Sequence, residues 1–268
     1  MVVFDKCPVC GYERFNNIYK VKWSGSKFVR CSCCKLIFQN PQEDRERTDS
    51  RYGDDYFRYE LNNETNFFGL IKATLNDFNI ENLLPAGSDV LEVGCATGLF
   101  LKYMNGLGYR SVGVELCKES AEYGIKTHNV QIINNRLENI DFADKKFDFV
   151  HFSHLIEHLN DPAEFLGIIY RLMKPGAIAL ITTPNSTGLF AGVYKEDWRC
   201  IVDDHLFLFN KSNLRLLLQS AGFKVSGIKT WGGIPSGAAP KIIKKSFDKI
   251  VKLTGIGDVV AILVTKPY

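Results

Sequence analysis

The segment that most constrains this chain is 89–98, DVLEVGCATG, where an apolar run leads into an acidic residue and a glycine-pinned turn. Val90, Leu91 and Val93 predict a buried parallel strand. The stretch that follows, 99–108, predicts a helix. A strand, a glycine turn and a helix in this order leave free backbone N–H groups at the helix start, where an anionic group binds well. The segment therefore predicts a nucleotide-like cofactor beside the turn.

The glycine spacing distinguishes between cofactors. The dinucleotide fingerprint has glycines at its first, third and sixth positions, whereas Ala96 and Leu99 occupy the last two here. NAD and FAD therefore fit poorly. S-adenosylmethionine has no pyrophosphate, and Glu92 is suited to hold its ammonium group, directly or through water. The next predicted strand, 111–116, places Glu115 at the spacing where a carboxylate meets ribose hydroxyls.

Cysteines are concentrated in the first forty residues, which hold five of the eight. CPVCG and CSCC read as two zinc knuckles separated by a strand-rich stretch, and four thiolates satisfy tetrahedral zinc. With four protein ligands the zinc would be structural, and it would supply folding free energy to a segment with little core. An odd number of cysteines argues against a disulfide framework. The predicted ligands are Cys7, Cys10, Cys31 and Cys34, with Cys33 as an alternative to Cys34.

Length and composition predict an ordinary globular enzyme. A chain of 268 residues with 46% hydrophobic content can bury one substantial core and carry a small appendage. No apolar run is long enough for a signal sequence or a membrane span, so we expect a cytoplasmic protein. A net charge of +3 is too small to indicate nucleic acid or an anionic membrane by itself.

Four motifs together resemble the class I S-adenosylmethionine-dependent methyltransferases. The resemblance covers roughly residues 80 to 230 and implies an α/β, Rossmann-like fold. Such a fold has a mostly parallel, seven-stranded sheet whose last strand is antiparallel. The motifs are EVGCATG (92–98), VGVEL (112–116), FDFVHFSHLIEHLNDP (147–162) and LMKPGAIALITTPN (172–185).

The N-terminal part is similar to the zinc ribbons that precede bacterial small-molecule and sugar methyltransferase domains. CPVCG, RCSCCKLIFQNP and YGDDYF carry this second resemblance. The expected organisation is a zinc ribbon at 1–40, a linker and helical lid at 41–80, and a methyltransferase domain at 81–268 with substrate insertions at 186–210 and 233–257.

The resemblance implies a set of cofactor-binding residues. They comprise the turn after the first strand, the end of the second strand, a loop at the adenine, the end of the fourth strand and a lid tyrosine. Tyr52, Phe57 and Tyr59 are further aromatic candidates in the lid. The predicted set is Glu92, Gly94, Cys95, Ala96, Thr97, Gly98, Glu115, Leu116, Asn135, Arg136, Leu137, Ser153, His154 and Tyr56.

His205 is the predicted catalytic base, because a histidine titrates near neutral pH and an alcohol or carbon acid acceptor must lose a proton. DHLFLF, around His205, resembles the EHLxYF segment of sugar methyltransferases, although Asp204 replaces its glutamate. HLIEH at 154–158 also matches the HxxEH pattern of inverted zinc peptidases. We reject that interpretation, because a peptidase needs a third ligand and a fold without a nucleotide loop, and we expect Glu157 and His158 to orient their loop.

The leading hypothesis is methyl transfer to oxygen or carbon of a small molecule, such as a sugar nucleotide or glycan precursor. An RNA methyltransferase is one alternative, because the ribbon is basic and Tyr19, Trp23 and Phe28 could stack on bases. A non-catalytic cofactor-binding module with a partner-binding ribbon is another.

Two helices are expected near the C-terminus. The first is N-capped at Ser212. The second is basic and amphipathic, carries Lys241, Lys244, Lys245, Lys249 and Lys252, and precedes a final antiparallel strand. The sequence does not indicate an oligomeric state.

Overall fold

The computed structural model describes residues 1–21, 24–44, 51, 53–233 and 241–268. Trp23 and Tyr52, two aromatic candidates of the sequence analysis, lie outside the described residues, as does part of the predicted insertion at 233–257. Among the described residues, no helix has both the length and the apolar character that a membrane span requires.

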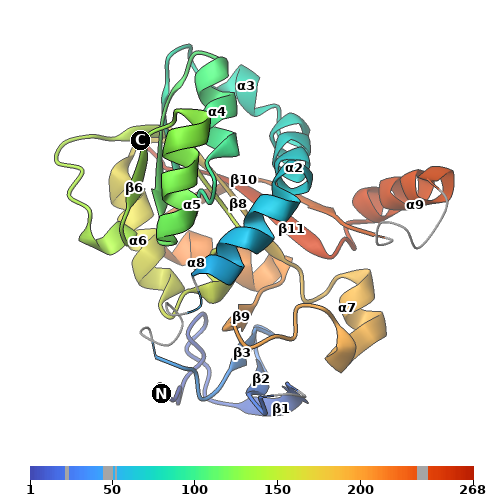
Figure 1. Cartoon of the computed structure of the whole chain (residues 1–268). Helices are drawn as coiled ribbons and strands as arrows, with labels where there is room; N and C mark the ends of the chain where they lie inside the picture. Colours follow the sequence, from blue (N-terminus) through green and yellow to red (C-terminus); the bar gives the residue numbers. More distant parts are fainter. Residues whose placement is uncertain (22–23, 45–50, 52, 234–240) are drawn as a thin grey trace.

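A seven-stranded sheet forms the centre of the molecule, in the order β10-β11-β8-β7-β4-β5-β6 (Figure 1). Five neighbouring strands from β8 to β6 are parallel, and β11 runs antiparallel between β8 and β10. This is the fold class that the sequence predicted. The strands are β4 (Asp89–Val93), β5 (Arg110–Glu115), β6 (Ile132–Asn134), β7 (Phe147–Ser153), β8 (Met173–Pro184), β10 (Lys224–Trp231) and β11 (Val259–Thr265).

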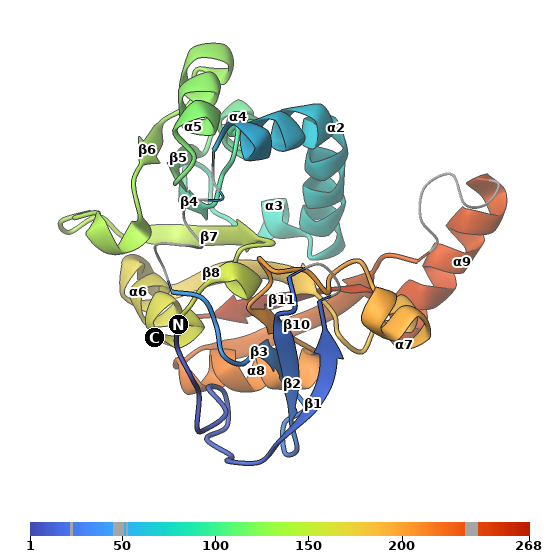
Figure 2. The same cartoon turned by 60° about the horizontal axis from the view of Figure 1, so that its bottom comes forward.

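Helices cover both faces of this sheet, because its strands carry buried apolar residues on alternate faces. Val90 packs with Phe100 of α4, whereas the next residue, Leu91, belongs to the core that α6 and α8 complete. The lid expected at 41–80 contains one long helix, α2, which lies beside the carboxyl ends of the parallel strands (Figure 2). The helices here are α2 (Asp54–Asp77), α3 (Ile80–Leu83), α4 (Leu99–Gly106), α5 (Lys118–Tyr123), α6 (Pro162–Leu172) and α8 (Lys211–Ser220).

The N-terminal ribbon forms part of a second, four-stranded sheet in the order β1-β2-β3-β9. Its fourth strand comes from a segment far along the chain and pairs antiparallel with β3 (Figure 1). Phe28 is fully buried in this ribbon, so it cannot stack on a base as the RNA alternative suggested. The strands are β1 (Phe15–Lys20), β2 (Lys27–Cys31), β3 (Ile37–Gln39) and β9 (Phe207–Leu208).

Short helical elements complete the chain, and α9 projects from the body in both views (Figures 1 and 2). One predicted cap is wrong: α8 is capped by Asn210, not Ser212, because Asn210 and Asn213 form a reciprocal capping box. The expected basic helix is present as α9. These elements are η1 (Gly124–His128), η2 (Leu137–Asn139), η3 (Ile156–His158), α7 (Leu189–Tyr194), η4 (Lys195–Asp197) and α9 (Lys241–Thr254).

Candidate functional site

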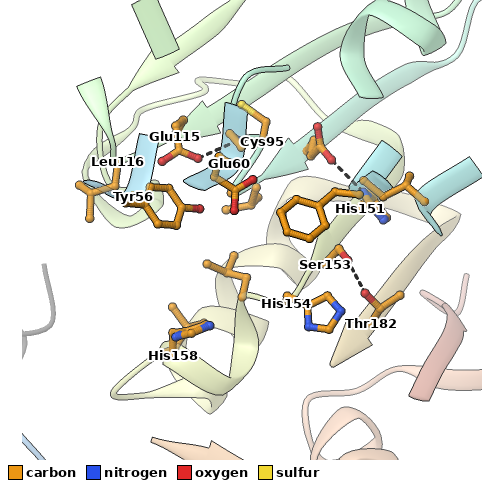
Figure 3. A pocket seen from close by; sticks show the side chains of 18 of the residues that line it. Tyr56, Glu60, Cys95, Glu115, Leu116, His151, Ser153, His154, His158 and Thr182 are labelled. Atoms are coloured by element: carbon orange, nitrogen blue, oxygen red, sulfur yellow. Dashed lines mark hydrogen bonds and ion pairs between the residues drawn. The ribbon is translucent and has the colours of Figure 1, made fainter. Parts of the chain in front are cut away.

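A cavity of about 680 Å³ opens beyond the carboxyl ends of β4, β5 and β7, below α2. All but one of the fourteen predicted cofactor-binding residues line it; the exception is Gly98. His205, the predicted base, lines the same cavity. Figure 3 shows Glu115 at the end of β5 with Leu116 after it, Tyr56 and Glu60 from α2, and Ser153 at the end of β7 with His154 after it, around this space.

The turn after β4 is held by Glu115. The backbone N–H of Ala96 donates to Glu115 Oε2 over 2.8 Å, and that of Cys117 donates to Oε1 over 2.7 Å. Ala96 adopts a positive φ of 44°, so its amide points toward this carboxylate. Burial raises the pKa of Glu115, and the backbone donors oppose that rise. Each carboxylate oxygen keeps a lone pair for a further donor, such as a ribose hydroxyl.

Two glycines in this region serve close packing. Gly98 has a φ of 77°, and a Cβ there would lie 2.8 Å from Val130 Cγ2. A Cβ at Gly113, on β5, would lie 2.4 Å from Cys95 Sγ. Gly98 therefore acts behind the cavity, by letting α4 begin directly after the turn.

Glu92 and His151 form a buried pair at the cavity. His151 Nδ1 lies 3.0 Å from Glu92 Oε1, and the ring of Phe100 stacks on the imidazole. Burial raises the pKa of Glu92 well above its usual range and lowers that of His151 to about 3. Glu92 Oε2 and His151 Nε2 have no hydrogen-bond partner in the described part of the chain. With Glu92 ionised and the proton of His151 on Nδ1, both of these atoms are acceptors, and they fit a cationic ammonium group, whose charge favours that ionised form.

His151 was missed by the sequence analysis. The sequence did contain a sign of its role. The run FDFVHF (147–152) is apolar except for Asp148, near the start of the strand, and His151, near its end. A polar residue that is fully buried in a sheet next to an acidic neighbour needs a partner. In parallel register, His151 stands beside Glu92.

Helix α2 is attached to the cofactor turn by Glu64. Thr97 Oγ1 donates to Glu64 Oε1, which also lies 3.0 Å from His128 Nε2. One helical turn earlier, Glu60 lines the cavity, and burial, followed by the charge of Glu115, raises its pKa to about 7. The sequence analysis did not identify Glu60 or Glu64, since acidic residues on a helix next to a linker are usually solvated.

The aromatic candidates in the lid separate into two kinds. Tyr56 and Tyr59 line the cavity. Phe57 instead contacts the ring of Tyr123, with the centroids 5.7 Å apart. In the predicted adenine loop, Leu137 is buried and Asn135 is exposed.

Glu157, His158 and His205 lie together at one side of the cavity, which the two histidines line, while Glu157 is fully buried and does not line it. One ligand-type atom from each lies within 4.8 Å of the others, and the two imidazole rings meet edge to face at 4.8 Å. Nδ1 of His158 lies 2.8 Å from the carbonyl oxygen of Asp204, and Nδ1 of His205 lies 3.0 Å from that of Cys200. Burial is the main cause that lowers the pKa of His205, to about 4.

Glu157 connects this group to β8 and to His154. Its side chain is fully buried, with Oε2 accepting from Thr183 Oγ1 at 2.9 Å and Oε1 at 3.3 Å from His154 Nδ1. Burial alone would raise the pKa of Glu157, but His154 and the other two histidines outweigh it and lower the pKa to about 2. The HLIEH segment thus places His154 and His158 on different partners, unlike the two ligands of a peptidase helix.

The four predicted cysteine ligands converge. Their sulfur atoms lie within 4.8 Å of one another, with Cys7 and Cys34 3.6 Å apart and Cys10 and Cys31 also 3.6 Å apart. Tetrahedral zinc with bonds of about 2.3 Å separates its sulfur ligands by about 3.8 Å, so the donor set and spacing fit zinc. Cys33 is exposed and outside this group, and none of the eight cysteines, all of them described, forms a disulfide.

Comparison with known proteins identifies the family. Residues 64–226 match a family model described as a methyltransferase domain. The chain is 30% identical over 141 residues to a probable S-adenosylmethionine-dependent methyltransferase of Mycolicibacterium smegmatis, covering 52% of this chain and 53% of the relative. It is also 30% identical over 112 residues to a ubiquinone biosynthesis O-methyltransferase of Xanthomonas axonopodis, covering 39% and 46%. The chain thus spans about half the length of these curated relatives.

Solved structures agree on the fold. A possible histamine N-methyltransferase of Thermotoga maritima superposes with a TM-score of 0.57 at 24% identity, covering 79% of this chain and 97% of that one. A methyltransferase of Archaeoglobus fulgidus, described as dependent on the same cofactor, also has a TM-score of 0.57 at 24% identity, covering 80% and 100%.

Proposed function

The chain belongs to the class I S-adenosylmethionine-dependent methyltransferases, and from this membership we propose that it methylates an oxygen or carbon atom of a small molecule. The supporting observation is that one cavity is lined both by the predicted cofactor residues and by His205. When bound, S-adenosylmethionine would supply a methyl group on a positively charged sulfur. The protein's contribution is to align the acceptor atom with that methyl group and to exclude water.

For the cofactor, we propose that Glu115 binds the ribose hydroxyls and that the Glu92–His151 pair accepts hydrogen bonds from the ammonium group. Asn135, Arg136 and Leu137 would surround the adenine. Structural zinc on Cys7, Cys10, Cys31 and Cys34 is part of the same proposal, and it takes no part in the chemistry because no coordination position is left open.

His205 is the proposed catalytic base. A neutral imidazole can take the proton of an acceptor hydroxyl, and the depressed pKa keeps His205 neutral at pH 7. We assign Glu157, His158 and His205 to proton transfer rather than to a metal ion, because Oε2 of Glu157 already accepts from Thr183 and Oε1 faces His154 at 3.3 Å. The buried carboxylate of Glu157 would stabilise a positive charge on His205 after the proton moves.

The acceptor is proposed to be a hydroxylated small molecule. Arg199 lines the cavity together with His205 and favours an acidic substrate, which includes sugar nucleotides. The relative from Xanthomonas is named for ubiquinone biosynthesis, so hydroxylated aromatic compounds are the other class to test. A cytoplasmic location fits the free thiols of the chain and remains part of this proposal.

The test combines calorimetry with an acceptor screen. Wild-type protein should bind S-adenosylmethionine and S-adenosylhomocysteine with micromolar affinity. It should then transfer a labelled methyl group to a member of a panel of sugar nucleotides and phenols. His205→Gln should lower turnover at least a hundredfold and leave cofactor affinity unchanged. Cofactor binding without transfer to any acceptor would favour a non-catalytic module, and equal turnover in His205→Gln would remove that residue from the mechanism.

A further inference from the structure

We propose that the ribbon holds the acceptor-side base in place and that Gln39, at the end of β3, is its positioning residue. This inference rests on the proposed role of His205 as the base. It gives the ribbon a part in catalysis although its cysteines lie outside the cavity.

The ribbon and the loop that carries His205 share one sheet. Ile37 pairs with Leu208 and Phe38 with Phe207, so β9 extends the three strands of the ribbon. The backbone N–H of Gln39 then donates to the carbonyl oxygen of Leu206 over 2.9 Å. The last ribbon residue in this ladder thus contacts the residue directly after His205.

The side chain of Gln39 binds the preceding turn of that loop. It is 1% exposed, and its Nε2 donates to the carbonyl oxygens of Asp203 and His205 over 2.9 Å and 3.0 Å. The carbonyl oxygen of Val202 lies farther away, at 3.4 Å. An amide nitrogen has two hydrogens, so the two short contacts use both of its donors. Buried bonds of this kind have no competing water and fix the loop backbone.

Other side chains from outside the loop bind its remaining carbonyl groups. Arg51 Nη1 donates to the carbonyl oxygen of Asp203, and Gln42 Nε2 donates to that of Leu206. The carbonyl oxygen of Asp204 accepts from His158. Of these donors, only Gln39 contacts the backbone of His205 itself. A base displaced by about 1 Å loses on the order of a hundredfold in rate, so this contact matters for proton transfer.

Apolar packing attaches the ribbon independently of Gln39. Leu36 and Phe38 are fully buried in the same core as Phe207 and Phe209. Replacing Gln39 by methionine, which has similar length and no donors, therefore removes the polar contacts while the ribbon stays docked. The variant separates positioning from folding.

Asn40 offers the matched control. Its side chain makes two hydrogen bonds to the backbone of Phe4, at 3.1 Å and 3.0 Å, both within the first forty residues. Asn40→Ala thus removes two ribbon hydrogen bonds next to Gln39 without removing a contact to His205. Both variants are made in the full chain and should retain wild-type zinc content and cofactor affinity.

Steady-state kinetics test the proposal. In Gln39→Met, kcat should fall at least tenfold while the KM for S-adenosylmethionine stays within twofold, and Asn40→Ala should keep kcat within twofold. The acid limb of kcat/KM should also move upward from about pH 4 toward the usual histidine value, because a loosened His205 gains solvent. Glu157, His158 and Asp204 face His205 in both proteins, so their charges do not account for the shift. Wild-type kcat in Gln39→Met, or equal losses in both variants, would overturn the proposal.

Hydrogen exchange of the segment 200–209 provides a readout that needs no turnover. Exchange should be faster in Gln39→Met than in Asn40→Ala and the wild type, and equal exchange in all three would refute the positioning role. If the wild type transfers no methyl group, the proposed function fails, while this measurement still decides whether Gln39 fixes the loop.

Discussion

The carboxylate of Glu115 holds the backbone amide of Ala96 at 2.8 Å, so the end of β5 fixes the turn that follows β4. Because the same carboxylate is proposed to bind ribose, its removal should both loosen the turn and delete a ligand contact. We expect Glu115→Ala to weaken S-adenosylmethionine binding at least tenfold, or about 1.4 kcal/mol, measured by calorimetry.

Glu122→Gln is the control for this substitution. Glu122 lies on α5, close in sequence, but it is exposed and pairs with Lys126 on the surface. Its replacement should leave the cofactor affinity unchanged. Equal affinities of wild type and Glu115→Ala would place the ribose elsewhere.

Gly113 should tolerate no side chain. A Cβ there would lie 2.4 Å from Cys95 Sγ and 2.6 Å from Leu101 Cδ1, in the buried layer between β5 and α4. Overpacking of this kind costs about 1 to 3 kcal/mol, so Gly113→Ala should lower the free energy of unfolding by that amount. At Gly106, on α4, nothing lies within 4 Å of a Cβ. Gly106→Ala should therefore leave the protein as stable or slightly stabilise it. Urea unfolding compares the two, and a neutral Gly113→Ala would show that α4 can shift away.

The cysteine group predicts one zinc ion per chain. Cys34→Ser should lose the zinc, because Cys34 Sγ lies 3.6 Å from Cys7 Sγ, whereas Cys33→Ser should retain it. Elemental analysis of the purified proteins measures both. Loss of zinc from Cys33→Ser and its retention in Cys34→Ser would exchange the two assignments. Two zinc ions in the wild type would indicate that Glu157, His158 and His205 bind a metal after all.

The cofactor half of the cavity was predictable from sequence because its determinants are local. Within ten residues, Glu92, Gly94 and Gly98 specify strand, turn and helix start, and the parallel order of the strands brings Glu115 to the same edge. The cysteine group was also predictable from the sequence, since the spacing within each pair is typical of ligands to tetrahedral zinc. Gly98 was predicted to line the cavity; it does lie in the predicted turn, but it packs against Val130 instead of lining the cavity.

The acceptor half was not predictable, because its contacts join distant segments. Gln39 and His205 are 166 positions apart, and nothing in the sequence of the ribbon indicates that β3 pairs with β9. Glu60 was missed for a different reason, because its environment arises only when helix α2 brings it next to Glu115. His151 did carry a signal, as a polar residue in an apolar strand, but its partner Glu92 lies on another strand.

We expect Glu60 to make cofactor binding depend on pH. It lines the cavity, and burial together with the charge of Glu115 raises its pKa to about 7, so it is largely protonated below that pH in the free protein. S-adenosylmethionine carries a net positive charge, which favours the ionised form of a nearby carboxyl group. Binding should therefore release a proton near pH 7, and the affinity should rise about three- to tenfold between pH 6 and pH 8.

Calorimetry at pH 7 in buffers of different ionisation enthalpy counts the released protons, and Glu60→Gln should abolish both the release and the pH dependence. Glu64→Gln distinguishes the carboxyl group of Glu60 from a general effect of α2, because Glu64 fastens the same helix to Thr97. Proton release that persists in Glu60→Gln would point instead to Glu92, whose pKa burial also raises. If proton release is lost in Glu60→Gln but not in Glu64→Gln, helix α2 contributes a charge to the proposed cofactor site in addition to covering that site.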